Sequence, residues 1–170
     1  GQKLTNIGAY CLMPNHLHLL IRENEDTDPA ISIFLKKLLT GYSMYFNKKR
    51  GRTGKLFEGP FKSSHIDNDR YLKYLFAYIH LNPVKTIDPT GWEKHIIRNP
   101  AMAKEFLDHY EYSSYPFYTG RQRLSDSILQ PRAFPAYFLT TREFSGFIED
   151  WINLSENKNI VPIIITCPIE

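Results

Sequence analysis

The sequence has little cysteine and no long apolar run, and each shortage narrows the possible functions. Its two cysteines, Cys11 and Cys167, lie far apart and outside any C-x-x-C pattern. A disulfide framework is therefore not indicated, and we expect a reducing, cytoplasmic location. The best apolar run, 160–165, is interrupted by a proline and is far shorter than a membrane-spanning helix, so no membrane partner is expected.

The chain also has no large excess of charge of either sign. Its 21 Lys and Arg residues against 18 Asp and Glu residues give a net charge of +3, which neither requires nor excludes a nucleic-acid partner. Basic residues nonetheless gather in one stretch: Lys48, Lys49, Arg50, Arg52 and Lys55. Taken alone, this stretch is more often a solvated turn than a phosphate-binding surface.

Apolar periodicity predicts a mixed α and β chain. Strands are expected over 7–13, over 16–22 and, interrupted at Gly59-Pro60, over 57–66. Helices are expected over 31–49, 68–81, 102–110 and 142–154. Asp67 is the expected N-cap of the second helix, which should end before Pro83, and residues 112–118 should form an aromatic loop.

A turn at Pro14-Asn15 joins the first two strands, and the second strand begins with His16-Leu17-His18. Alternate residues of a strand share a face, so both imidazoles should point to one side, while Leu17 and Leu19 are buried on the other. Two imidazoles at this spacing can bind one metal ion, although a lone His-x-His is more often a pair of ordinary surface histidines.

The helix over 68–81 carries Tyr78, and Asn82 follows one turn later on the same surface. Leu72, Leu75, Phe76 and Ile79 form its expected buried stripe. Taken separately, a tyrosine beside an apolar stripe usually packs its ring, and an asparagine before proline usually ends a helix. Together with the two histidines, these residues instead suggest phosphoryl transfer, in which a divalent cation orients a phosphate for attack by the tyrosine.

Three stretches carry a resemblance to a known family: YCLMPNHLHLLI, FEGPFKSSHIDNDRYLKYLFAYIHLNPVK and YEYSSYPFYTG. They resemble the REP-associated tyrosine transposases of the single-tyrosine HUH class, over residues 7–120. The resemblance implies that His16, His18 and Asn82 bind Mg²⁺ or Mn²⁺ and that Tyr78 is the nucleophile. It also implies an α+β fold with a ferredoxin-like antiparallel sheet and helices on one face.

The resemblance further implies an enzyme that nicks and rejoins single-stranded DNA at hairpins through a 5′-phosphotyrosine, as a monomer or homodimer. Members of the group have a strand and a helix ahead of the AYCLMPNH segment, and we expect either that this portion is missing here or that another chain supplies it. Residues 1–120 are then an N-terminally incomplete transposase-like domain, and residues 121–170 are a tail of unassigned role with a helix. The basic stretch, with Lys36, Lys37 and Lys62, becomes a candidate DNA-binding surface.

Two other functions compete with this interpretation. One is a domesticated module of the same fold that binds DNA hairpins without cleaving them. The other is a zinc-dependent hydrolase, which the sequence disfavours because it has no His-Glu-x-x-His motif and no cysteine close to the histidines.

Overall fold

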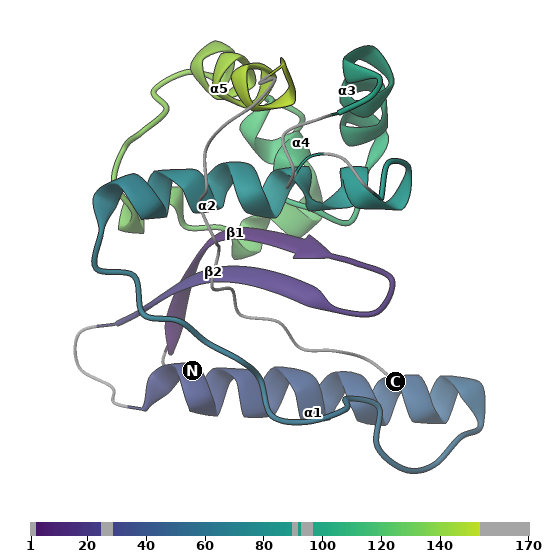
Figure 1. Ribbon diagram of the computed structural model, residues 1–170. Helices are drawn as coiled ribbons and strands as arrows, with labels where there is room; N and C mark the ends of the chain where they lie inside the picture. The colour runs from purple at the N-terminus through teal and green to yellow at the C-terminus, as the bar shows by residue number, and fades with distance from the viewer. Residues whose placement is uncertain (1–2, 25–28, 90–91, 93–96, 154–170) are drawn as a thin grey trace.

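An antiparallel hairpin lies at the centre of the computed structural model, which describes residues 3–24, 29–89, 92 and 97–153 (Figure 1). Strand β1 (Thr5–Leu12) pairs with β2 (Leu17–Glu23), with Cys11 opposite His18. The Met13 amide donates to the His16 carbonyl at 2.8 Å and closes the turn. The predicted hairpin is therefore confirmed, and these two strands form the sheet of the described residues.

The two faces of the hairpin are covered by different helices. Leu17 and Leu19 pack with Leu35 of α1 (Ala30–Arg50), whereas Leu20 packs in the cluster that includes α2 (Asp69–Leu81). Figure 1 shows α1 beneath the hairpin and α2 above it. The expected mixture of α and β structure is confirmed, but the expectation that the helices lie on one face is wrong. Leucines of β2 point to both faces, and each face requires an apolar cover.

Helix α2 is buried continuously from Tyr74 to Leu81, because it has neighbours on two sides. The hairpin lies on one side, and α3 (Pro100–His109), α4 (Tyr115–Tyr118) and α5 (Thr141–Asn153) lie on the other (Figure 1). The predicted stripe covers only part of this surface, and Leu72 within it is half-buried. Helix α4 is a single turn within the stretch that was expected to be an aromatic loop.

The ends of α2 follow from its sequence. Asn68, rather than the expected Asp67, is the N-cap, and its side chain accepts a hydrogen bond from the Tyr71 amide at 3.1 Å. The helix ends at Leu81, as the following proline predicts, and the chain continues as the 3-10 turn η1 (Asn82–Thr86). Proline is tolerated at the start of such a turn because its missing N–H would have no partner there.

The expected strand over 57–66 is wrong. Within this stretch only Phe57 and Lys62 occupy isolated bridge positions, and the rest has no strand pairing. Gly59 favours a bend and Pro60 has no N–H to donate to a ladder, so the segment connects α1 to α2 as irregular chain.

The described part of the predicted tail packs into the main core. Two short 3-10 turns, η3 (Leu124–Ile128) and η4 (Pro131–Ala133), lead to α5, whose Phe144, Ile148 and Ile152 are buried in the same cluster as α2. The predicted helices over 102–110 and 142–154 correspond to α3 and α5. The rest of the tail, residues 154–170, lies outside the described residues.

Candidate nucleophile and metal site

The hairpin turn brings His16 and His18 together. His18 lies on β2 and is 1% exposed, while His16 precedes the strand and is half-buried. Their ring centroids are 4.7 Å apart, with the ring planes nearly perpendicular. Because Leu17 points to the α1 face, both imidazoles lie on the α2 side of the hairpin, as the strand alternation predicted.

Tyr78 reaches the same place from α2. Its ring centroid is 5.6 Å from that of His18, with the planes at 90°. The ring also packs against Trp92 at 5.1 Å and Tyr74 at 6.1 Å, and Tyr78 is 5% exposed. A strand residue and a helix residue that are distant in sequence therefore contact each other directly.

Asn82 lies at the C-terminal end of α2 and is fully buried. Its Nδ2 donates to the Tyr78 carbonyl at 2.8 Å. Its Oδ1 is buried and has no hydrogen-bond partner among the described residues. A buried amide oxygen without a donor is costly to the fold, and a metal ion is one partner that would satisfy it.

The donor set fits a divalent ion that keeps several ligands from water or substrate. Two imidazoles and one amide oxygen fill at most half of an octahedral site. In the part of the chain that the structure describes, no group of three or more His, Cys, Asp or Glu side chains could hold a metal. Any ion bound here would consequently depend on the asparagine oxygen and on external oxygen ligands.

The surroundings of His16 favour the neutral imidazole that a metal ligand needs. Partial burial, and secondarily the positive charge of Lys85, lower its pKa below the ordinary value, which favours the neutral imidazole. Its Nδ1 lies 2.7 Å from Asn15 Oδ1. When Nδ1–H donates this hydrogen bond, the lone pair of Nε2 is available to a metal ion.

Lys85 and Trp92, which the sequence did not single out, also border Tyr78. Lys85 Nζ lies 5.1 Å from the Tyr78 ring centroid and 5.8 Å from that of Trp92. The spacing of Tyr78, Asn82 and Lys85 is i, i+4, i+7, which would have placed Lys85 on the same face if the chain stayed helical after Pro83. No comparable signal marks Trp92.

A second buried polar group was not apparent from the sequence. His80 on α2 is fully buried; its Nδ1 lies 2.7 Å from the Phe76 carbonyl and its Nε2 lies 2.7 Å from Ser114 Oγ. Burial lowers the pKa of His80 to about 4, so the ring is neutral at physiological pH. With both ring nitrogens hydrogen-bonded inside the core, His80 stabilises the contact between α2 and the segment before α4.

The predicted DNA-binding residues lie on another part of the molecule. Lys48, Lys49 and Arg50 form the last turn of α1, and we call them, with Arg52 and Lys55, the basic cluster. Lys36, Lys37 and Lys62 are exposed outside it. Since α1 and α2 cover opposite faces of the hairpin, the structure does not place the basic cluster next to Tyr78. The C-terminal end of α1, which carries the cluster, and the hairpin turn both lie on the right of the view (Figure 1).

Aromatic rings accompany the basic cluster. Lys49 Nζ is 5.5 Å from the Tyr45 ring centroid, and the Arg50 and Arg52 guanidinium carbons are each 5.9 Å from that of Phe46. Tyr45 is 57% exposed. An exposed aromatic ring among cations suits a strand with unpaired bases, because bases stack on such rings while phosphates contact the cations.

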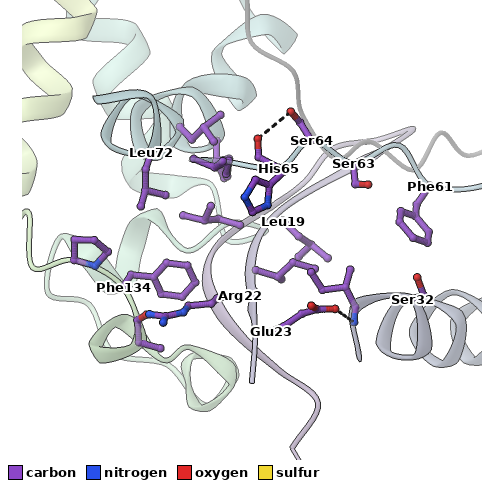
Figure 2. Close-up of a pocket in the computed structure, with 18 residues that line it drawn as sticks. Leu19, Arg22, Glu23, Ser32, Phe61, Ser63, Ser64, His65, Leu72 and Phe134 are labelled. Atoms are coloured by element: carbon purple, nitrogen blue, oxygen red, sulfur yellow. Dashed lines mark hydrogen bonds between the residues drawn. The ribbon is translucent and has the colours of Figure 1, made fainter. Parts of the chain in front are cut away.

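A cavity of about 680 Å³ lies between β2, the start of α1, residues 61–66, one face of α2 and residues 133–135 (Figure 2). The charged side chains Arg22 and Glu23 that line this cavity form hydrogen bonds to the backbone. Arg22 donates to the Ala133 carbonyl at 2.9 Å, and Glu23 accepts from the Ile31 amide at 3.0 Å. His16, His18 and Tyr78 do not line it.

No family model matches the chain, and no curated protein or solved structure matches it. Among the described helices, none is both long enough and apolar enough to cross a membrane.

Proposed function

We propose that this chain is a single-strand DNA endonuclease and strand transferase of the single-tyrosine HUH class, with Tyr78 as its nucleophile. The contact between the His16–His18 pair and Tyr78, with the His18 and Tyr78 ring centroids 5.6 Å apart, carries the proposal. The ferredoxin-like antiparallel sheet of this class is part of the proposal, with β1 and β2 as two of its strands, while the helices cover both faces of the hairpin.

In the proposed reaction, the Tyr78 hydroxyl oxygen attacks the phosphorus of a DNA phosphodiester. The bond from phosphorus to the tyrosine oxygen forms, and the bond from phosphorus to the 3′ oxygen of the leaving strand breaks. The phenolic proton is released and the leaving oxygen is protonated to a 3′-OH. Because water does not attack the phosphorus, the 5′-phosphotyrosine conserves the bond for rejoining.

His16, His18 and Asn82 are the residues that would hold Mg²⁺ or Mn²⁺. When bound, the ion supplies charge that polarises the scissile phosphate. Asn82 also fixes the last turn of α2 through its hydrogen bond to the Tyr78 carbonyl, so one side chain positions the nucleophile's backbone and offers an oxygen ligand.

The basic cluster would bind a DNA hairpin remote from the reaction. Exposed lysine and arginine side chains contact phosphates without reading sequence, and Tyr45 offers a stacking surface for an unpaired base. Cleavage and most of the affinity would then depend on different residues.

One observation favours a second function, a hairpin-binding module without cleavage. Tyr78 is 5% exposed, so little of this residue is accessible to a phosphate. The two functions share the basic cluster and differ in whether a covalent bond forms.

A denaturing-gel assay distinguishes them. The protein is incubated with a 3′-labelled pool of hairpin oligonucleotides and either Mn²⁺ or Mg²⁺, and a protein-linked labelled fragment is sought, because the 5′-phosphotyrosine retains the DNA on the 3′ side of the cut. We expect an adduct that EDTA and His16→Ala abolish, while hairpin binding persists. Binding without an adduct under either metal would establish the binding module, and an adduct that persists in EDTA would contradict the metal site.

A further inference from the structure

Lys85 occupies an unusual position for a lysine. It lies in η1, is half-buried, and places its ammonium group over the rings of Tyr78 and Trp92 at 5.1 and 5.8 Å from their centroids. The turn that carries it is ordered: the Thr86 hydroxyl donates to the Pro83 carbonyl at 2.7 Å, and the Ile87 amide donates to the Val84 carbonyl at 3.0 Å.

We propose that Lys85 binds the scissile phosphate next to the Tyr78 hydroxyl, an inference that rests on the proposed function. A partly dehydrated ammonium interacts more strongly with a nearby anion than an exposed one does, because less solvent screens the charge. Lysine binds phosphate as a point charge on a flexible stem, so its head group can move from the ring faces to a phosphate oxygen.

Trp92 adds a hydrogen-bond donor at the same place. Its Nε1 is buried and has no hydrogen-bond partner among the described residues, although an indole N–H normally finds an acceptor. The ring that contacts Lys85 and Tyr78 therefore carries a donor that a phosphate oxygen could satisfy. The basic cluster differs, since most of it is exposed and it lies beyond the other face of the hairpin.

The alternative is that the cation–π contact of Lys85 only stabilises the fold. Lys73 provides a matched control, because its Nζ lies 5.6 Å from the Phe147 ring centroid and 6.0 Å from those of Tyr137 and Phe138. Lys73→Met removes a comparable cation–π contact from α2 without touching Tyr78. A purely structural role predicts that Lys73→Met and Lys85→Met behave alike.

The test measures two quantities, the single-turnover rate of adduct formation at saturating hairpin DNA and the dissociation constant of the DNA. Both are measured on two substrates. One carries the normal linkage at the cut site mapped with the wild-type protein, and the other carries an uncharged methylphosphonate there. On the normal linkage, Lys85→Met should slow the reaction by about 100-fold with little change in affinity, as for the loss of one donor to a transition-state oxyanion. Lys85→Arg should recover most of the rate, and Lys73→Met should match the wild type.

On the methylphosphonate, the wild type and Lys85→Met should react at equal rates, because no charge remains for the ammonium to bind. Lys85→Gln gives the same comparison if the methionine variant does not fold. Wild-type adduct formation with an unchanged rate in the Lys85 variants would overturn this inference alone. The same loss of rate on both substrates would assign Lys85 a structural role, and a wild type without any adduct would overturn the proposed function and this inference together.

Discussion

His80 should make the folded state less stable as the pH falls from 7.5 to 5. Its neutral ring is fixed between the Phe76 carbonyl and Ser114 Oγ, and the rings of Tyr118 and Phe144 cover it. A proton on Nε2 would replace an acceptor with a donor that faces the serine hydroxyl, in surroundings with little water. Protonation therefore favours the unfolded chain.

The size of the effect follows from the two pKa values of His80. The folded value is about 4 and the ordinary value is 6.5, so the native state binds fewer protons between these limits. The contribution of the neutral His80 ring to the free energy of unfolding is fully present above pH 6.5 and is lost as the pH falls toward 4. At about 1.4 kcal/mol per pH unit, the loss is roughly 2 kcal/mol at pH 5 and approaches roughly 3 kcal/mol below pH 4.

Urea unfolding at pH 7.5 and pH 5 measures this loss. His80→Gln should be less stable than the wild type at pH 7.5, but it should lack the additional loss of about 2 kcal/mol on acidification. His109→Gln is the matched control: His109 is exposed on α3, and its Nδ1 also lies close to the carbonyl four residues earlier, at 2.8 Å. It should retain the wild-type pH dependence. Equal pH dependence in the wild type and His80→Gln would refute this reasoning.

Three further predictions concern packing and DNA binding. In Gly8→Ala the new methyl carbon would lie 2.8 Å from the Phe134 ring, so the free energy of unfolding should fall by about 1–3 kcal/mol, and the effect should vanish in a Phe134→Ala background. Phe144→Ala should lower the free energy of unfolding by about 3–5 kcal/mol because the ring is fully buried, and a loss below about 1 kcal/mol would show that α5 is not part of the core. Reversing the charges of Lys48, Lys49 and Arg50 should flatten the slope of log affinity against log salt, by about 0.7 for each single-strand phosphate that the protein no longer neutralises. An unchanged slope would show that these residues form only a solvated turn.

Local periodicity was enough to predict the faces on which His18 and Tyr78 lie, whereas their approach across the fold was expected from the family resemblance. Strand alternation separates Leu17 and Leu19 from His18, and helical spacing puts Tyr78 and Asn82 on one surface. Both rules depend only on near neighbours in the chain. The roles of these residues in binding metal and cleaving DNA remain predictions.

Features that depend on distant segments could not be predicted in this way. The burial of His80 requires Ser114 and α5, which are remote in sequence, and the predicted apolar stripe of α2 did not include His80. Lys85 was missed because the proline before it predicts the end of a helix but not the 3-10 turn that follows. The expected strand over 57–66 failed because strand propensity has no effect without a pairing partner.

The identity of the oxygen atom that becomes linked to DNA decides whether Tyr78 is the nucleophile. Tandem mass spectrometry of the digested adduct should find the nucleotide on the peptide that contains Tyr78, and Tyr78→Phe should abolish the adduct while hairpin binding and stability stay near wild type. Tyr74→Phe is the matched control, since its ring lies next to that of Tyr78 with the centroids 6.1 Å apart, and this variant should still form the adduct. A nucleotide found on Tyr71 or Tyr74, or an adduct that persists in Tyr78→Phe, would contradict the assignment of Tyr78 as the nucleophile.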